Sequence, residues 1–220
     1  EFTVTGPDGY SKVYKTDKSG AFQTDALKPG MYTVTETKAP DGYYISDQPS
    51  KTVEVKAGAG TLVEMQEAVF ENEQILMPIR IKKTDGDKKD PKPLVGAEFK
   101  VYRLEGTDGQ SKTEVDTLVT DMHGEAVSRL LPAGSYEVVE TQPPKGYELA
   151  ENPSQKVTIN KDSTEETLTF TFVNEILKGT LKIRKVDSET KKVLPGAVFE
   201  AYSTEFGVYY RATSADDGYA

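Results

Sequence analysis

One stretch of this sequence occurs twice, in similar form, and restricts what the chain can fold into. The sequence reads YTVTETKAPDGY at residues 32–43 and YEVVETQPPKGY at residues 136–147. Each copy predicts a strand that runs into a Pro/Gly turn. Because side chains alternate between the two faces of a strand, Glu36 and Glu140 each share a face with a Tyr and a Val. A carboxylate on an apolar face is costly unless a partner meets it there.

The composition indicates an all-β protein and argues against several classes of partner. Val, Thr, Tyr, Phe and Ile occur in short runs between turns rich in Gly, Pro and Asp, as is typical of sheets. A net charge of −9 disfavours nucleic acid or an anionic membrane surface as the main partner. No apolar run is long enough to span a bilayer. The absence of cysteine fits a cytosolic protein, and equally an exported one that uses no disulfides.

The strand pattern repeats at the scale of a domain. Asn72 and Asn174 are 102 positions apart, as are Lys83 and Lys185, and this period is too long for a single solenoid repeat. We therefore expect three tandem domains at residues 1–75, 76–176 and 177–220. About seven short strands in one period are typical of an immunoglobulin-like sandwich. In the first domain the expected strands are 1–5, 11–16, 31–37, 51–57 and 61–72.

The two outer domains are each expected to be partial. The first lacks the opening strand of the second, and the third stops after its second or third strand, so we interpret the chain as cut from a longer array. The junctions around residues 72–78 and 174–179 are short and do not resemble flexible Gly/Ser linkers. Tandem domains joined in this way predict a semi-rigid rod.

The outer strands repeat the pattern of the glutamates, because each places a polar residue after apolar ones on the same face. Lys83 follows Ile79 and Ile81, and Lys185 likewise follows Leu181 and Ile183. The asparagines follow Phe and Ala in the same way, Asn174 after Phe170 and Phe172, and Asn72 after Ala68 and Phe70. One such residue is explained by a strand end that reaches solvent. The recurrence of lysine, glutamate and asparagine at equivalent positions of the repeats favours burial of the three together.

Buried together, lysine, glutamate and asparagine have chemistry available. Loss of solvent lowers the pKa of a lysine and raises that of a glutamic acid, so the pair can exist as a neutral amine and a protonated acid. A neutral amine is a nucleophile, and a protonated glutamate can polarise a carboxamide and carry protons. Attack with loss of ammonia would leave a Lys–Asn amide, with proximity in the core replacing an enzyme.

At this point the residues carry a family resemblance over essentially the whole chain. The matching pieces are KTD and KVD at residues 83–85 and 185–187, GAEF and GAVF at 96–99 and 196–199, the two copies of the ETxxPxGY stretch, and FEN and FVN at 70–72 and 172–174. The chain resembles tandem B-type domains of Gram-positive collagen adhesins (CnaB, SpaA-like or prealbumin-like), which also occur in pilins. The resemblance implies Greek-key β-sandwiches.

The resemblance also implies a spontaneous intramolecular isopeptide bond between lysine and asparagine, with glutamate as catalyst. The set is complete only in the second domain, as Lys83, Asn174 and Glu140. The first domain holds Glu36 and Asn72 without a lysine, and the third holds Lys185 alone. No cofactor, metal or nucleic acid is implied.

The function implied is that of a stalk in an extracellular, cell-wall-anchored adhesin, and not of an enzyme. The partners expected are adjacent domains, with host extracellular matrix reached only through domains outside this sequence and no membrane insertion in this segment. A pilus shaft and a ligand-binding adhesin module are the alternatives. A further hypothesis is that Lys185 of one copy reaches Asn72 and Glu36 of another. It is opposed by residues 197–220, which duplicate strands that the first domain already has.

Two other motifs are given no function. The acidic loop at residues 85–90 departs from the EF-hand pattern, contains two lysines and has no counterpart after Lys185. His123 is the only histidine, and it falls in a predicted turn without a nucleophile beside it.

Overall fold

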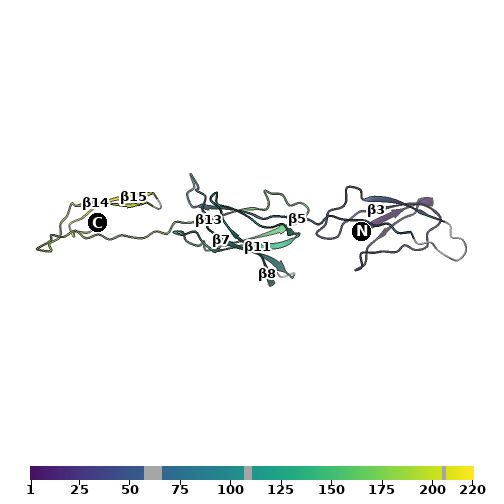
Figure 1. The fold of residues 1–220 in the computed structure, drawn as a ribbon, viewed down its shortest axis with the longest axis horizontal. Helices are drawn as coiled ribbons and strands as arrows, with labels where there is room; N and C mark the ends of the chain where they lie inside the picture. Colours follow the sequence, from purple (N-terminus) through teal and green to yellow (C-terminus); the bar gives the residue numbers. More distant parts are fainter. Residues whose placement is uncertain (57–65, 107–110, 205–206) are drawn as a thin grey trace. The chain divides into compact units, whose positions relative to one another are not determined.

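The computed structural model describes residues 1–56, 66–106, 111–204 and 207–220, and its regular structure there is almost entirely β (Figure 1). One short 3₁₀ helix, η1 (Pro7–Gly9), is the exception in the described part of the chain. The all-β expectation is therefore confirmed. Contacts divide the chain into two compact units, residues 1–176 and 177–220. Within the described ranges, no helix is long and apolar enough to cross a membrane.

The first sheet of the larger unit is antiparallel throughout. Its strands lie in the order β2-β1-β3-β4, with the bounds β1 (Phe2–Thr5), β2 (Ser11–Tyr14), β3 (Gly30–Glu36) and β4 (Ser50–Val55). Phe2, Val4 and Tyr32 are buried on one face, because alternating side chains of β1 and β3 point the same way in register.

The predicted strand 61–72 is not formed where the structure describes it. Residues 61–65 of that prediction lie outside the described residues, and 66–72 have no strand conformation. Strand structure depends on hydrogen bonds to a neighbouring strand, and no described strand runs beside this segment. Phe70 is partly buried, as its place in the apolar alternation predicts. Alternation alone does not form a strand, because a strand also needs a hydrogen-bonded neighbour.

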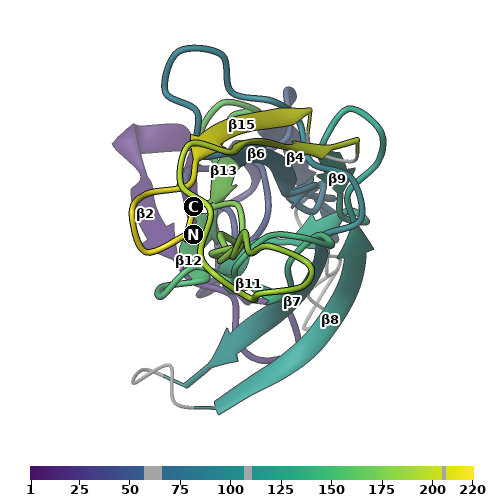
Figure 2. The ribbon, with the colours of Figure 1, turned by 90° about the vertical axis from the view of Figure 1, so that its left-hand side faces the viewer.

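The second part of the larger unit contains two further principal sheets. The first has the order β12-β11-β7-β8 and is antiparallel, and Figure 2 shows its long neighbours β7 and β8 side by side. The second has the order β13-β6-β9, with β13 parallel to β6. A short pair joins β5 to β10. The bounds are β5 (Leu76–Met77), β6 (Arg80–Asp85), β7 (Glu98–Glu105), β8 (Ser111–Val119), β9 (Glu125–Val127), β10 (Leu131–Pro132), β11 (Gly134–Gln142), β12 (Ser154–Ile159) and β13 (Thr169–Asn174).

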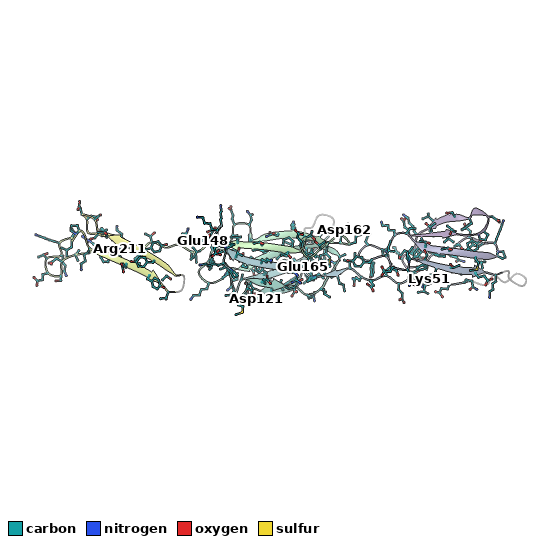
Figure 3. All side chains as sticks on the ribbon, turned by 90° about the horizontal axis from the view of Figure 1, so that it is seen from above. Lys51, Asp121, Glu148, Asp162, Glu165 and Arg211 are labelled. Atoms are coloured by element: carbon teal, nitrogen blue, oxygen red, sulfur yellow. The ribbon has the colours of Figure 1, made fainter. Side chains whose placement is uncertain are left out.

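One apolar core lies between these two sheets. Ile81 of β6 and Phe172 of β13 come from one sheet, and Phe99 of β7 and Val138 of β11 from the other, and all four belong to a single buried cluster. Asp162 and Glu165, both labelled in Figure 3, are exposed, whereas Lys83 and Glu140 are buried exceptions among the charged side chains. Alternation along each strand therefore separates core from surface, as expected of a sandwich.

The first sheet repeats the second part's larger sheet strand for strand. The order β2-β1-β3-β4 corresponds to β8-β7-β11-β12, and β3 pairs with β1 as β11 pairs with β7. Phe2 lies opposite Glu36 and Phe99 lies opposite Glu140. The duplicated sequence thus produces a duplicated sheet.

The unit of residues 177–220 contains an antiparallel hairpin, β14 (Val198–Ser203) with β15 (Val208–Thr213). Its segment 181–187 makes only isolated bridges. The expectation that Leu181, Ile183 and Lys185 share a buried face is wrong here, since Leu181 is 68% exposed and Lys185 is exposed. The described residues of this unit provide no second sheet to cover that face.

Candidate functional site

Three predicted site residues meet inside the sandwich formed by β5 to β13. Lys83 lies on β6, Asn174 ends the adjacent parallel strand β13, and Glu140 lies on β11 of the facing sheet. Each residue is 1% exposed. The lysine is directly opposite Phe172, two residues before Asn174 along the parallel strand, so its long side chain reaches along β13 toward the asparagine.

The geometry of the trio leaves several polar atoms without hydrogen bonds. Asn174 donates from Nδ2 to Glu140 Oε2 at 3.1 Å, and Lys83 Nζ lies 3.7 Å from Glu140 Oε1, beyond hydrogen-bond distance. Lys83 Nζ, Glu140 Oε1 and Asn174 Oδ1 are buried without a hydrogen-bond partner. Such atoms are rare in folded proteins and require an explanation.

Burial pushes both ionisable groups of the trio toward their neutral forms. It lowers the pKa of Lys83 to about 8, against the attraction of Glu140. It raises the pKa of Glu140, against the attraction of Lys83 and the hydrogen bond from Asn174. Both shifts favour the neutral pair, an amine beside a carboxylic acid, over the ion pair.

Two aromatic rings keep the trio out of water. Phe99 lies opposite Glu140 in the β7–β11 ladder and is 0% exposed. Phe172 lies opposite Lys83 and meets Phe99 edge-on, with ring centroids 4.9 Å apart. This apolar lining is the physical source of both pKa shifts, because it offers the charged forms no solvation.

A β-bulge follows the glutamate and was missed in the sequence. Glu140 pairs with Phe99 and Gln142 with Glu98, so Thr141 is the extra residue. Its Oγ1 donates to the carbonyl of Glu98 at 3.2 Å. Thr141 and Gln142 are both exposed, so Glu140 is the last residue of β11 that faces the core. A bulge reorients the side chains beside it.

A similar set of hydrogen bonds follows the glutamate of the first sheet. Thr37 N and Lys38 N both donate to the carbonyl of Glu1, at 2.9 and 3.3 Å, and Thr37 Oγ1 donates to it at 3.2 Å. The Glu-Thr pair repeated at 36–37 and 140–141 was the signal that could have revealed the bulge.

The partial site predicted in residues 1–75 holds its glutamate and asparagine together. Asn72 donates from Nδ2 to Glu36 Oε2 at 2.7 Å and to the carbonyl of Tyr44 at 2.9 Å. Glu36 is 3% exposed. No ion pair reaches Glu36 within the described residues. The side chains of Glu36 and Asn72 therefore form their hydrogen bond without a lysine beside them.

Lys185 stands apart from any such set in its own unit. Its side chain is exposed, and residues 177–220 contain no asparagine. The structure therefore brings together three of the six predicted site residues as a trio, two as a pair, and leaves the sixth alone.

The carboxylates of Asp85 and Asp87 in the acidic loop accept hydrogen bonds from backbone amides of the same loop. Asp85 Oδ1 accepts from the amides of Asp87 and Lys92, and Asp87 Oδ1 accepts from those of Lys89 and Asp90. Over the described ranges, no group of three His, Asp or Glu residues is arranged to hold a metal ion. His123 is exposed in a turn and donates its amide to Asp121.

Several solved structures are similar to this chain. The Bacillus anthracis TIE protein shares 28% identity with a TM-score of 0.76, covering 100% of this chain and 38% of that chain. The chain thus spans well under half of that protein. A streptococcal ancillary pilin shares 23% identity with a TM-score of 0.38, over 88% of this chain and 62% of that chain.

The minor pilin GBS52 of Streptococcus agalactiae shares 18% identity with a TM-score of 0.37, over 86% of this chain and 85% of that chain. A search of curated proteins returns no match. The model of the SpaA prealbumin-like fold domain matches residues 1–68 and 77–174, and the chain therefore belongs to this family.

Proposed function

We propose that residues 76–176 form a self-crosslinking structural domain, in which Lys83 and Asn174 join through an isopeptide bond with Glu140 as proton carrier. The observation that carries the proposal is the set of three buried, unpartnered atoms, Lys83 Nζ, Glu140 Oε1 and Asn174 Oδ1. These are the nucleophile, the acid and the oxygen to be polarised. The bond would relieve all three at once.

The reaction begins with a proton transfer from Lys83 to Glu140, which gives the neutral amine and the carboxylic acid. The acid then donates a hydrogen bond to Asn174 Oδ1, which requires the side-chain amide to turn over from its present orientation, in which Nδ2 faces Glu140. Burial favours this neutral state, since it lowers the pKa of Lys83 and raises that of Glu140. General acid–base catalysis of this kind needs only contact distances and matched pKa values.

Bond formation follows when Lys83 Nζ attacks Cγ of Asn174. The Nζ–Cγ bond forms, the Cγ–Nδ2 bond breaks, and Glu140 relays one proton from Nζ to Nδ2, which leaves as ammonia. Glu140 ends with the proton count it had before the attack, and no oxidant, metal or cofactor enters the balance. The reaction turns over once per chain, so the domain is not an enzyme toward other molecules.

We assign the chain to the stalk of a Gram-positive surface adhesin, divided into tandem domains at 1–75, 76–176 and 177–220 that form a rod. Its membership of the SpaA prealbumin-like family supports this role, and its similarity to the Bacillus anthracis TIE protein over 100% of this chain supports the fold. Its partners are then neighbouring domains of the same array, and its location is extracellular and attached to the cell wall. The role does not require this segment to bind host matrix.

The intact mass of the purified chain tests the crosslink. We expect a deficit of one ammonia in the parent and the full mass in Lys83→Ala and Glu140→Ala. Glu36→Ala is the matched control, since its pair has no lysine, and it should keep the parent's deficit. A parent of full mass would refute the crosslink and leave the fold intact.

The stalk role has its own test. Antibody against this segment should label intact cells of the organism that produces it, and the isolated segment should show no saturable binding to extracellular-matrix proteins. Saturable binding would instead favour an adhesin module.

A further inference from the structure

The backbone of Lys83 is held by a turn that recurs in all three domains, and one glycine of that turn touches it. The Lys83 amide donates to the carbonyl of Gly124 at 2.7 Å, and the Lys83 carbonyl accepts from the amide of Leu94 at 2.9 Å. These two bonds fix the peptide units on both sides of the lysine.

Gly124 occupies a place where a side chain does not fit. Its φ is +70°, in the left-handed region, and a Cβ there would lie 2.4 Å from the Lys83 carbonyl oxygen and 3.0 Å from Leu94 N. Both neighbours are backbone atoms, so neither can move aside as a flexible side chain could. Two separate reasons, conformation and close approach, therefore require glycine.

The turn that presents Gly124 is tightly built. Asp121, labelled in Figure 3, accepts from the amides of His123 and Glu125 through Oδ1, and its own amide donates to the carbonyl of Glu125. The Gly124 amide donates to the Asp121 carbonyl at 2.9 Å. The turn is thus closed by its own hydrogen bonds and can serve as a fixed support.

The third domain repeats the contact around its own lysine. Lys185 N donates to the carbonyl of Gly218 at 2.8 Å, and the Lys185 carbonyl accepts from Leu194 N at 3.1 Å. Gly218 has a φ of +77°, and a Cβ there would lie 2.9 Å from the Lys185 carbonyl oxygen. The contact between a turn glycine and the lysine backbone therefore forms at Lys185 as well, where no glutamate or asparagine completes a trio.

The first domain has the turn without the lysine. Gly20 has a φ of +80°, its amide donates to the Asp17 carbonyl, and the Asp17 amide donates to the carbonyl of Ala21. A Cβ at Gly20 would meet nothing within 4 Å. Gly20 therefore shares the conformational requirement of Gly124 and lacks the close approach.

We propose that Gly124 is a positioning residue for crosslinking: its close contact sets the Lys83 backbone so that Nζ reaches Asn174. The inference rests on the proposed function, because it concerns the rate of that reaction. A displacement of about 1 Å at a reacting group can cost about a hundredfold in rate, and the contact acts on the peptide unit that carries the nucleophile.

The test compares Gly124→Asn with Gly20→Asn. Asparagine tolerates a positive φ but carries a Cβ, so it separates close approach from backbone conformation. Chains made by brief cell-free synthesis are quenched in denaturant at intervals, and their ammonia loss is followed by intact mass. We expect Gly124→Asn to react about ten- to a hundredfold more slowly and Gly20→Asn to keep the parent rate.

A Gly124→Asn chain that reacts at the parent rate overturns the proposal, and so does an equal slowing of both variants. Folding is checked separately in a Glu140→Gln background, which cannot react, by placing the same substitutions there and measuring thermal unfolding. If Gly124→Asn does not fold, hydrogen exchange on the Glu140→Gln chain decides. Protected Lys83 and Leu94 amides support the clamp, and exchange at loop rates overturns it. A parent that never loses ammonia refutes the proposed function instead.

Discussion

The first and second predicted domains (residues 1–75 and 76–176) contain the same four-stranded sheet and the same glutamate, but among the described residues only the second has a facing sheet, β13-β6-β9. In the second domain β6 supplies Lys83 and pairs with β13, and the closing segment is a regular strand that ends at a buried Asn174. In the first, no described strand takes the place of β6, and residues 66–72 are irregular. Asn72 is only partly buried.

This difference shows which parts of the site form independently. The contact between acid and amide exists in both domains, at 2.7 Å in the first and 3.1 Å in the second. In both, the threonine that follows the glutamate donates its hydroxyl to a carbonyl of the neighbouring strand segment, Thr37 to Glu1 and Thr141 to Glu98. The opening strand therefore adds the nucleophile and orders the closing strand, and it is not needed to aim the glutamate.

Loss of the crosslink should give the largest contrast between the domains. Asn174→Ala removes the bond that would close a loop of roughly ninety residues, so we expect it to lower the free energy of unfolding of the second domain by about 4–5 kcal/mol. Asn72→Ala removes only hydrogen bonds and should cost about 1 kcal/mol. Hydrogen exchange resolved by region measures each domain, and equal losses would contradict the difference in crosslinking.

The closing segments should differ next most strongly in their dependence on packing. Phe172 meets Phe99 edge-on at 4.9 Å and is 4% exposed, whereas Phe70 meets Phe2 edge-on at 5.0 Å but is only partly buried. We expect Phe172→Ala to cost about 3–4 kcal/mol and Phe70→Ala about 1 kcal/mol. Thermal unfolding by calorimetry compares them. A larger cost at Phe70 would mean that the first domain packs its closing segment as tightly.

A pH dependence should belong to the second domain alone. In the folded, unlinked parent chain, burial lowers the pKa of Lys83 from its ordinary value of 10.5 to about 8, and Asn174→Ala keeps the chain unlinked so that this titration can be followed. Between pH 8 and 10.5 the unfolded state binds more protons, so stability should rise with pH, by at most about 1.4 kcal/mol per unit. Below pH 8 both states hold the proton and the cost of burial is fully present. Urea titrations measure the slope.

The matched control for this rise is Lys83→Met in the same Asn174→Ala background. It removes the buried amine and should remove the rise, while any contribution from exposed lysines remains. The first domain buries no lysine among its described residues. A rise that persists in the double variant would assign the titration to another group.

The smallest expected contrast is in the rate of crosslinking when the threonine after each glutamate loses its hydroxyl. Thr141→Val removes the hydroxyl that donates to the Glu98 carbonyl, and we expect crosslinking to slow by about two- to fivefold, as for an exposed hydrogen bond worth about 0.5–1 kcal/mol. Thr37→Val makes the same change in the first domain and should leave the rate unchanged. Thr141→Ser should restore it. The time course of ammonia loss measures all three, and a slowed Thr37→Val chain would contradict local action.

Alternation along the strands was sufficient to predict which residues share the interior. Ile79, Ile81 and Lys83 face the core, because period-2 patterning depends only on local geometry. The same argument failed for Leu181 and for residues 66–72, where burial or pairing depends on a strand elsewhere in the chain. Polar β8 was not predicted, since Ser111–Val119 is largely exposed and offers little alternation.

The details that aim the reacting groups could not be predicted in this way. The bulge at Thr141 is a register shift between two distant strands, and the contact of Gly124 with Lys83 joins a turn to a strand some forty residues earlier. Neither leaves a periodic signal. Only the repetition of Glu-Thr and of a glycine turn in successive domains marks them.

The parallel pairing of β6 with β13 has a mechanical consequence. Parallel neighbours place the start of one strand and the end of the other at opposite ends of the ladder, so a force applied at Arg80 and Asn174 loads the ladder's hydrogen bonds in shear, all together. An antiparallel pair held at the same end would instead unzip one bond at a time. A covalent link from Lys83 to Asn174 would lie in parallel with that ladder and carry the load before any hydrogen bond breaks. Extension of the second domain would then stop at the linked strands until a covalent bond breaks.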